Sequence, residues 1–570
     1  MKTEFYKREN IPSWILTIFI FSLLIVGIPS CAKIGTPTGG AYDRTPPKLL
    51  DAKPKINSTN FKEKGFEVAF DEYIELSNSQ EELIISPPFK EKPSVKAHLN
   101  KLKVSWDDTL AANTTYIFDF GSSIVDYTEG NKLNNFVYSF STGSFIDTME
   151  YNGKVIEAYS LKPVARKYVM LYKSKERDIV SKEKPNYLTR TDSSGYFKFQ
   201  NIAQGSYQIL VLDDKNQNLL YDLPTEAIAF SKEKIDATLY MRDTVRVTDS
   251  TSLKDTIKKP LTTPSNTLYF YEPKDTKINL SSSNLISPHH IKLCFSNPTT
   301  DSLNFVFSYP KLIGKTDKNI FLQFNNTKDS IDIWTLEQRF DSVKFSVIDV
   351  DLKEDVELYN SKIGKEKIKD TFSFMVPKQN LAYFSECLLE MPFPVNNDTI
   401  SFEAMVIKEK DTTKIKCKPS LKSPLFIQVG EKFEQGSKQQ IKIKEGSIRN
   451  KLGQVNDSIS FYLTVDNEND YGNFFFSVED TLLRNNNYIL ILEDMQGKEL
   501  MTLYSKNKER IKFPNLKEGG YRLKIIIDSN NNKKWDYGNY NLNILPEEVM
   551  YFAKPINIRK NWDIEEVFIP

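Results

Sequence analysis

The chain has 570 residues, more than one hydrophobic core normally serves, so we expect about four or five domains of ~100 residues each. Its 76 Lys and Arg residues nearly balance 75 Asp and Glu residues, which leaves a net charge of +1. This balance excludes a global electrostatic field of the kind that attracts nucleic acid. Aromatic residues make up 12% of the chain and recur in short alternating runs such as GFEVAF and SISFYLTV, which predicts an all-β protein.

The first thirty residues have the features of a secretion signal. A basic segment precedes an apolar stretch from Ile11 to Ile28 that is about as long as a bilayer is thick. The stretch runs into the sequence IPSC, which resembles a bacterial lipobox. We therefore expect residues 1–30 to be a lipoprotein signal peptide, cleaved so that Cys31 becomes the lipid-modified first residue. An uncleaved membrane anchor is the alternative.

The residues after the expected cleavage site point to the outer membrane. Residues 31–44 are rich in Gly, Pro and Thr, which predicts a flexible tether. Ala32 stands where, in the best-known sorting rule, an Asp retains a lipoprotein in the inner membrane. Several acyl chains hold a protein firmly on a bilayer, because each buried methylene contributes about 0.8 kcal/mol. We expect a lipid-anchored outer-membrane protein and leave open whether its body faces the periplasm or the cell exterior.

The remaining cysteines do not suggest a disulfide framework. Cys294, Cys387 and Cys417 are an odd number in an oxidising compartment. Buried free thiols are the favoured interpretation, although one pair could form.

Residues 45–145 predict a first β-sandwich. They open with TPP and close with YSFSTG, and between these lie short alternating strands separated by turn residues. The motifs FEVAFDE and TTYIFDFGSSIVDYTEGN resemble those of bacterial Ig-like domains. The resemblance implies an Ig-like fold for this segment.

Residues 150–241 predict a second β-sandwich of another kind. Their strand carrying VMLY and the later TDSSGYFKF and GSYQILVL resemble the carboxypeptidase regulatory-like domain, a transthyretin-type sandwich. That domain is a noncatalytic appendage of the enzymes after which it is named. Asp192 and Gly195 are expected to form its hairpin turn.

The rest of the chain divides into a linker and three further domains. Residues 242–266 are rich in Thr, Ser and Lys and lack aromatics, which predicts a linker. Residues 267–378 predict a β domain of unknown family. Residues 379–466 resemble a second Ig-like domain, and residues 470–570 a second transthyretin-type domain.

A long repeat supports this second pair of domains. The segments 197–222 and 511–536 match through a strand, a turn and a loop, and Phe513 and Asp536 lie the same 314 positions after Phe199 and Asp222. Such a register indicates duplication of one β module.

Each copy of the repeat ends in a loop rich in Asp and Asn. The oxygen-bearing side chains stand at positions one, three, five and nine of each loop, namely Asp214, Asn216, Asn218 and Asp222, and Asp528, Asn530, Asn532 and Asp536. Calcium prefers six to eight oxygen ligands, and the pattern resembles calcium loops of other bacterial β modules. The Gly usual at position six is replaced by Leu219 and Lys533. The alternative is an Asx-rich turn that caps itself. Calcium is the one cofactor that the sequence suggests.

Catalytic motifs are scarce. The chain has three histidines and contains no HExxH, GxSxG, GxxxxGK[ST] or CxxC motif. The adjacent His289 and His290 precede a strand, and we expect them to face solvent. We do not expect an enzyme.

Taken as a whole, the sequence resembles the outer-membrane lipoproteins of Bacteroidota that combine bacterial Ig-like and carboxypeptidase regulatory-like domains. The resemblance implies a noncatalytic scaffold or accessory subunit that docks on an outer-membrane β-barrel, such as a transporter or a barrel-assembly machine, or on other envelope lipoproteins. Strand addition to sandwich edges is the expected mode of docking. We expect no nucleic-acid partner.

Two other functions remain open. A glycan- or surface-binding module would need an exposed aromatic platform, for which Trp106, Trp334, Trp535 and Trp562 are the candidates. Trp106 is expected in a core, and Trp535, within the second Asx loop, is the best exposed candidate. A hydrolase would have its site in residues 267–378.

Overall fold

The computed structural model describes residues 42–569 apart from short gaps and one long one. The residues outside the description are 1–41, 175, 238–265, 274–276, 310–318, 337–341, 351, 360–370, 377–379, 401–403, 408–411, 416–418, 431–432, 480–486 and 570. The predicted signal peptide, Cys31, most of the tether and most of the predicted linker therefore lie outside the described residues. Within the described part, no helix is long and apolar enough to span a membrane.

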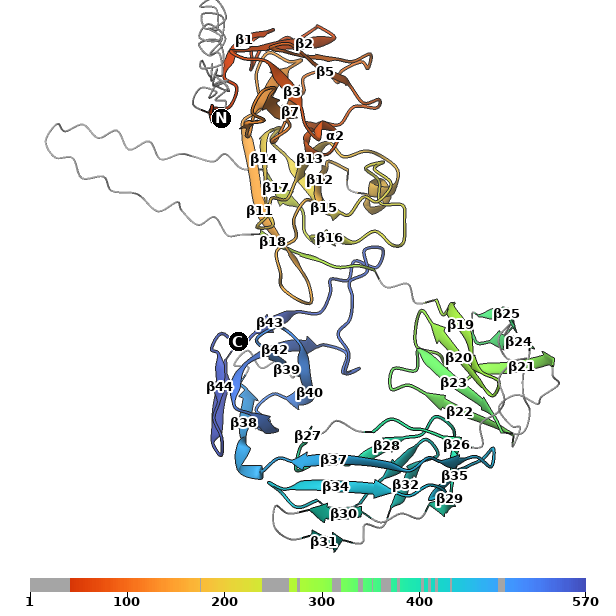
Figure 1. Ribbon diagram of the computed structural model, residues 1–570. Coiled ribbons are helices and arrows are strands. Elements are labelled where there is room, and N and C mark those ends of the chain that lie inside the picture. The colour runs from red at the N-terminus through yellow and green to blue at the C-terminus, as the bar shows by residue number, and fades with distance from the viewer. Residues whose placement is uncertain are drawn as a thin grey trace, which may run out of the picture. The chain divides into compact units, whose positions relative to one another are not determined.

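The chain forms two compact units, and the regular elements of its described residues are almost all β-strands, as the alternating sequence runs predicted (Figure 1). Of the described residues, those within 42–85 and 89–146 form one unit, and those within 86–88 and 147–569 form the other.

The first unit is a sandwich of short strands with one four-residue helix, α2 (Ser79–Glu82). Its sheets have the orders β1-β2-β6-β5, β10-β7-β4 and β3-β8-β9. The strands are β1 (Leu49–Lys53), β2 (Gly65–Phe70), β3 (Ile74–Leu76), β4 (Ile84–Ser86), β5 (Ser94–His98), β6 (Lys101–Ser105), β7 (Thr115–Asp119), β8 (Ile124–Asp126), β9 (Lys132–Leu133) and β10 (Val137–Ser141).

Aromatic side chains fill the core of this first unit. Phe66 on β2 stacks on Tyr138 of β10 with ring centroids 3.7 Å apart, and Trp106 stacks on Phe140 at 5.7 Å. Trp106 is only 5% exposed, which confirms its expected place in the core. Buried and half-buried residues alternate along GFEVAF, which places Phe66, Val68 and Phe70 on the core-facing side of β2.

The turn of the sequence IVDYTEGN is held by a single carboxylate. Asp126 is 2% exposed and accepts backbone N–H bonds from the four residues Thr128 to Asn131 at 2.5–3.1 Å. These bonds lower the pKa of Asp126 against the opposing effect of its burial, so the turn keeps an ionised carboxylate at its centre.

The second unit begins with a module that we call the first repeat module, formed by residues 149–236 and 266–271. Its sheets have the orders β14-β11-β18 and β13-β12-β15-β16, with β17 also paired to β15. The strands are β11 (Met149–Glu157), β12 (Tyr168–Tyr172), β13 (Tyr187–Arg190), β14 (Tyr196–Ile202), β15 (Ser206–Leu212), β16 (Ile228–Phe230), β17 (Ile235–Asp236) and β18 (Asn266–Phe270). The 3-10 helix η1 (Arg177–Ser181) lies between β12 and β13.

Strand β18 belongs to this first repeat module and not to the domain that follows it. The sequence boundary placed residues 267–378 in the following domain, but Asn266 to Phe270 pair in parallel with Gly153 to Glu157 of β11. Leu268 and Phe270 are buried in the same core as Phe197 and Phe199. The sequence signal missed this strand because residues 238–265 separate it from the rest of its sheet.

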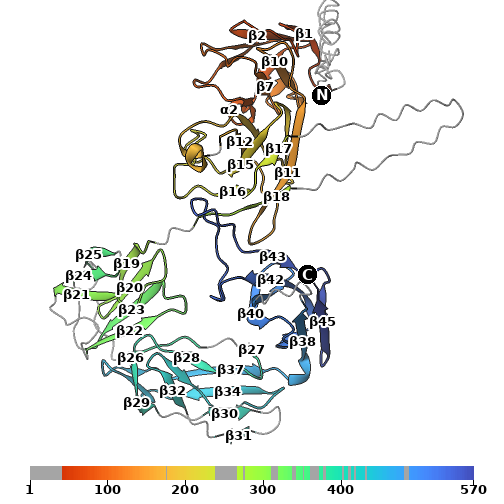
Figure 2. The same ribbon diagram turned by 180° about the vertical axis from the view of Figure 1, so that it is seen from behind.

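The second repeat module, residues 471–569, has the same strands in the same order. Its sheets are β41-β38-β45 and β40-β39-β42-β43, with β44 on β42, and Figure 2 shows β45 beside β38. The strands are β38 (Tyr471–Val478), β39 (Asn487–Asp494), β40 (Glu499–Lys506), β41 (Ile511–Lys517), β42 (Gly519–Asp528), β43 (Val549–Tyr551), β44 (Ile556–Ile558) and β45 (Asp563–Phe568). β45 pairs in parallel with β38, as β18 does with β11. The duplication therefore covers the whole module.

Two details repeat between the modules at atomic level. The Tyr207 hydroxyl donates to the carbonyl of Ala203 at 2.6 Å, and the Tyr521 hydroxyl donates to the carbonyl of Lys517 at 2.7 Å. Asn201 and Asn515 both have positive φ, 54° and 56°, where the pairing of β14 and β41 shifts register. Asn tolerates this left-handed conformation better than most residues, which explains why it stands at both positions.

Residues 278–359 form a separate sandwich around a core of Ile, Leu, Val and Phe. Its sheets have the orders β19-β20-β23-β22 and β21-β24-β25. The strands are β19 (Leu280–Ser287), β20 (His290–Phe295), β21 (Asn304–Tyr309), β22 (Ile320–Phe324), β23 (Ser330–Thr335), β24 (Ser342–Ile348) and β25 (Lys353–Tyr359).

Residues 371–465 form the domain that was expected to resemble the first unit. Its sheets have the orders β26-β36-β35-β29, β27-β37-β34-β30-β31 and β28-β33-β32. The strands are β26 (Thr371–Phe372), β27 (Asn380–Leu381), β28 (Leu388–Glu390), β29 (Val395–Ile400), β30 (Ala404–Ile407), β31 (Thr412–Ile415), β32 (Ser420–Ser423), β33 (Phe426–Gln428), β34 (Lys438–Ile443), β35 (Ile448–Asn450), β36 (Val455–Asn456) and β37 (Ile459–Val465).

This domain starts earlier than residue 379, the boundary set from the sequence. Strand β26 pairs in parallel with β36, and Phe372 and Phe374 lie in the same core as Ile441 and Leu463. The buried Asn450 takes the place that Asp126 has in the first unit, because its side-chain oxygen accepts the backbone N–H groups of Leu452 and Gln454.

The matching tyrosine bonds of the repeat modules provide a test of the duplicated fold. Tyr207→Phe and Tyr521→Phe each remove one hydroxyl that bonds a carbonyl four residues earlier, and each should destabilise its module by about 1 kcal/mol. Chemical denaturation of the purified chain measures this loss. Tyr504→Phe, at a tyrosine that is 46% exposed, is the control and should leave the midpoint unchanged. Equal stability of all three variants would contradict the assigned role of the two hydroxyls.

Candidate functional site

The two Asx loops adopt the same backbone and the same side-chain bonds. Asp214 accepts the backbone N–H groups of Asn218 and Leu219 at 3.2 and 2.8 Å. Asp528 accepts those of Asn532 and Lys533 at 3.1 and 3.0 Å. The first carboxylate of each loop thus closes the loop through local hydrogen bonds, as in an Asx-rich turn.

The last carboxylate of each loop is held by amide groups. Asp222 accepts the side-chain N–H groups of Asn216 and Asn218 at 3.1 and 2.7 Å. The equivalent bonds from Asn530 and Asn532 to Asp536 measure 2.5 and 2.8 Å. All eight residues singled out from the sequence therefore lie in two compact hydrogen-bonded loops.

Position six of each loop has the left-handed backbone that a Gly would supply. Leu219 and Lys533 both have φ of 62°, so the backbone takes this conformation despite the missing Gly. Strain of this kind persists only where surrounding bonds determine the conformation, and the carboxylates of Asp214 and Asp528 provide those bonds.

A glutamate behind each loop escaped the sequence analysis. Glu226 accepts the backbone N–H groups of Lys215 and Asp222 at 3.3 and 3.2 Å. Glu547 accepts those of Ser529 and Asp536 at 2.7 and 3.2 Å, and burial raises its pKa above the usual range for a glutamate. The similar segments DLPTEAIAF and ILPEEVMYF contain these residues and are the sequence signal from which they could have been found.

Calcium binding by these loops stays a prediction. The loops present carboxylate and amide oxygens, the ligands that calcium prefers. Within the described residues, no group of three or more His, Cys, Asp or Glu side chains is arranged to hold a metal ion. Any ion in these loops would therefore depend on the Asn side chains and on backbone carbonyls as well as on the two carboxylates.

The second Asx loop continues into an insertion that the first loop lacks. Three residues separate Asp222 from Glu226, whereas ten separate Asp536 from Glu547. The additional residues include Tyr540, which is 7% exposed and is buried against the first repeat module. Its ring lies edge-on to Phe230 and Tyr221 with centroids 5.2 and 5.8 Å away.

Arg177 of η1 and Tyr540 bind each other through both backbone and side chain. The Tyr540 hydroxyl donates to the Arg177 carbonyl at 2.8 Å, and the Arg177 guanidinium donates to the Tyr540 carbonyl at 2.6 Å and to Asn543 Oδ1 at 2.7 Å. The guanidinium also lies 4.4 Å from the centre of the Tyr540 ring, a cation–π distance. Burial raises the pKa of Tyr540 to about 12, so its hydroxyl remains a donor at neutral pH.

A loop of the first repeat module packs on the second repeat module in return. Tyr159 and Leu161 contact a cluster of Ile489, Ile491, Ile526 and Val549 on the face of the sheet turned away from the second module's own core. The contact is reciprocal, because each module covers apolar surface of the other.

Tyr159 also covers a buried ion pair of the second repeat module. Lys524 and Glu493 are 3% and 2% exposed and lie 2.6 Å apart between nitrogen and oxygen. The Lys524 ammonium is 3.9 Å from the centre of the Tyr159 ring, and the Tyr159 hydroxyl donates to Glu499 at 2.5 Å. Excluding water from such a pair makes both charges depend on the protein groups around them.

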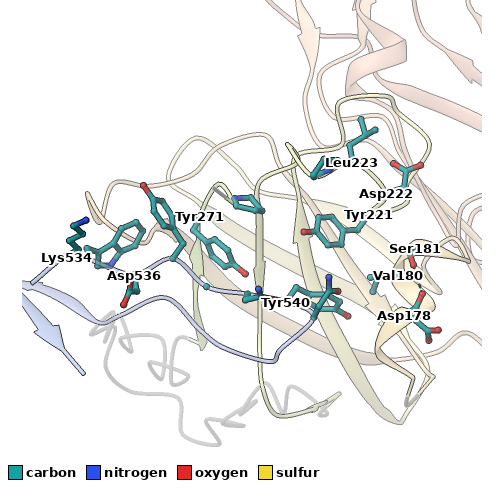
Figure 3. A pocket seen from close by; sticks show the side chains of 17 residues that line it. Asp178, Val180, Ser181, Tyr221, Asp222, Leu223, Tyr271, Lys534, Asp536 and Tyr540 are labelled. Carbon is teal, nitrogen blue, oxygen red and sulfur yellow. Dashed lines mark hydrogen bonds between the residues drawn. The ribbon is translucent and has the colours of Figure 1, made fainter. Parts of the chain in front are cut away.

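A cavity of about 1080 Å³ lies between the two repeat modules (Figure 3). Its walls include Asp222 and Asp536, the position-nine carboxylates of the two Asx loops. In the view of Figure 3, Tyr271 lies between the end lined by Asp536 and the end lined by Tyr221 and Asp222. The fold therefore brings together one residue from each of the two predicted loops, although 314 positions separate them in the chain.

The histidine pair is more buried than expected. The His290 side chain bonds Asp332 at 2.7 Å and stacks on Trp334 at 4.4 Å, and its burial lowers its pKa below the usual histidine value. His289 packs edge-on against Phe393 of the next domain at 6.0 Å. Packing accounts for both rings, since they help to join the 278–359 and 371–465 domains.

The other candidate residues are spread over the molecule. Trp334 is 4% exposed, Trp535 is half-buried with its indole N–H donating to the Glu547 carbonyl at 3.0 Å, and Trp562 is 57% exposed. Cys387 is a buried free thiol and Cys294 is a half-buried one, while Cys417 lies outside the described residues.

Comparison with known proteins identifies one domain. Residues 43–142, which form the first unit's sandwich, match the family described as bacterial Ig-like domain. This agrees with the resemblance expected for residues 45–145. The match covers less than a fifth of the chain, and no curated protein matches it.

Several solved structures are similar to the chain, each with low sequence identity and a low TM-score. The major pilin subunit BcpA of Bacillus cereus has 10% identity and a TM-score of 0.15, with 74% of this chain and 99% of that chain covered. The Bacillus anthracis TIE protein has 11% identity and a TM-score of 0.14, covering 94% and 76%. A Bacteroides ovatus protein, SGBP-B of a mixed-linkage glucan utilization locus, has 9% identity and a TM-score of 0.20, covering 82% and 99%. At these scores the likeness supports no argument about function.

The Asx loops give a prediction that separates structural from metal-binding roles. Asp214→Ala and Asp528→Ala each leave two backbone N–H groups without their carboxylate, and we expect each to lower stability by about 1–3 kcal/mol in metal-free buffer. Calorimetric melting with chelator and with millimolar calcium measures both effects. A calcium-dependent rise in Tm of the unaltered chain that either variant reduces would establish the ion, and an unchanged Tm would rule it out.

The insertion gives a prediction for the contact between the repeat modules. Tyr540→Ala removes a ring buried against the first module and should weaken docking by about 3 kcal/mol. Gly538→Ala should act in the same direction, because an added Cβ would lie 2.5 Å from the Tyr271 ring. Hydrogen–deuterium exchange should then increase at residues 157–162 and 221–224.

Leu542→Ala is the matched control for this docking experiment. Leu542 belongs to the same insertion but is 68% exposed. We expect it to leave exchange unchanged, and equal protection in all three variants would show that the insertion does not hold the modules together.

Proposed function

We propose that this protein is a noncatalytic, lipid-anchored scaffold or accessory subunit of an outer-membrane protein complex. In this proposal Cys31 holds the chain on the membrane, and the sandwich domains dock on a β-barrel such as a transporter or barrel-assembly machine, or on other envelope lipoproteins. The bacterial Ig-like domain at residues 43–142 and the serial sandwiches that follow support a structural role.

The reciprocal contact of the repeat modules is the observation on which the proposal rests. The distinctive residues of the repeat, namely the Asx loops, Tyr540 and Arg177, are bonded to each other and to backbone. Their bonding closes loops and joins modules, which stiffens a chain that presents other surfaces. A stiff array of modules is what a scaffold requires.

Edge strands supply surfaces for docking. Strands β18 and β45 each stand at the end of a three-stranded sheet in the described part of the chain. Such edges present backbone N–H and C=O groups in a row, to which an extended partner segment can add a strand. On β45, Val567 is 44% exposed, and Trp562 just before the strand is 57% exposed. These side chains would contact the partner beside the added strand.

Lipid attachment is tested by Cys31→Ser. The variant lacks the thiol that a diacylglycerol group would modify, so we expect loss of radiolabelled palmitate and release of the chain from the membrane fraction. Palmitate labelling and carbonate extraction of membranes measure the two effects. Unchanged labelling would contradict lipidation at Cys31, and full retention after carbonate would favour the uncleaved membrane anchor.

The proposed complex is tested by affinity purification of the full chain from gently solubilised outer membranes. We expect a β-barrel protein or a second lipoprotein to copurify in a fixed ratio. Val567→Lys on edge strand β45 should reduce that ratio, whereas Val137→Lys, at the 37% exposed Val137 of the first unit, is the control. Recovery of the chain alone after chemical cross-linking in whole cells would contradict the scaffold function.

A further inference from the structure

We propose that the cavity between the two repeat modules binds a neutral oligosaccharide. This inference concerns the 1080 Å³ cavity of Figure 3 and does not depend on lipid attachment or on a barrel partner. The ligand class follows from three properties of the walls, which are an unsatisfied buried hydroxyl, several aromatic rings and a mixture of hydrogen-bond donors and acceptors.

The Tyr271 hydroxyl is the strongest indication of a ligand. The Tyr271 side chain lines the cavity and is 1% exposed, and its hydroxyl finds no hydrogen-bond partner among the described residues. A buried hydroxyl without a partner costs about 1–3 kcal/mol, so native structures rarely keep one without a reason. A ligand hydroxyl that reached this group after a small shift of the atoms covering it would bond it and remove that cost.

The aromatic walls suit the apolar faces of sugar rings. Tyr221, Trp535 and Tyr537 line the cavity together with Tyr271 and Tyr540. Tyr537 is 40% exposed and lies 4.7 Å from the Trp535 ring at a steep angle, so part of its face is open to a ligand. Rings of this kind provide a large contact area with few rotatable bonds, as ligand pockets require.

The carboxylates are held so that they can accept hydroxyl protons. Asp222 and Asp536 are fixed by the amides of Asn216, Asn218, Asn530 and Asn532. A carboxylate has about four lone-pair sites, and the amide bonds leave sites for donors on a ligand. The two Asx loops would thus place one oriented acceptor at each end of the cavity.

Charge balance favours a neutral ligand over a cationic one. Asp178 is already paired with Lys182, and the cationic residue Lys534 lines the same cavity as the remaining carboxylates. Asn539 and Asn541 add amide groups that both donate and accept. A polyhydroxylated chain matches this mixture, whereas an organic cation would use the carboxylates and leave the donors unsatisfied.

Binding is tested by isothermal titration calorimetry of the full chain in a sugar-free zwitterionic detergent. The probes are cellohexaose, laminarihexaose, maltohexaose, xylohexaose and mannohexaose, with octalysine as the cationic probe. We expect at least one hexasaccharide to bind. Tyr271→Phe should weaken that binding at least tenfold while leaving Tm unchanged or higher, because it removes only the unpartnered hydroxyl. Tyr537→Ala should also weaken it at least tenfold.

Tyr504→Ala is the matched control, since Tyr504 is a 46% exposed tyrosine of the second repeat module that does not line the cavity. It should bind the sugar as the unaltered chain does. Three results would overturn the proposal, namely no binding of any hexasaccharide at millimolar concentration, sugar binding that Tyr271→Phe and Tyr537→Ala leave unchanged, or binding of octalysine alone.

Discussion

The contact between Tyr540 and Arg177 determines how the two repeat modules pack against each other. Each residue donates a hydrogen bond to the other's backbone carbonyl, and the guanidinium lies against the tyrosine ring. Because these two hydrogen bonds and the ring contact form together in one arrangement, the contact fixes both position and orientation. This arrangement also forms the walls of the cavity and lets each module cover apolar surface of the other.

The contact solves a problem that duplication creates. A two-sheet sandwich buries one face of each sheet, yet the cluster of Ile489, Ile491, Ile526 and Val549 is apolar on a face outside the module's own core. An apolar surface of this kind exposed to water favours association. Tyr159 and Leu161 of the first repeat module cover this cluster, so the apolar surface of the second module becomes the binding surface for the first.

The two copies differ where their roles differ. The Asx loops themselves are equal down to the left-handed residues at Leu219 and Lys533, because the same carboxylates determine the same backbone. The insertion that follows Asp536 has no counterpart after Asp222 and contains the ring that docks. The same loop therefore occurs twice, and the longer segment that follows the second copy connects the two modules and lines the cavity between them.

The sequence by itself determined the all-β class, the Ig-like domain near the N-terminus, the repeat of 314 positions and the eight residues of the Asx loops. These features are local, because alternating strands, turn residues and short loops are recorded in neighbouring positions. The sequence boundaries placed strands β18 and β26 in the wrong domains. Strand β18 is separated from the rest of its module by 28 residues, and strands of five or two residues are too short to indicate which strand they pair with. Only the tertiary structure decided three features, namely that Asp222 and Asp536 line one cavity, that Tyr540 binds Arg177, and that the Tyr271 hydroxyl has no partner among the described residues. They depend on contacts between residues that are hundreds of positions apart in the chain.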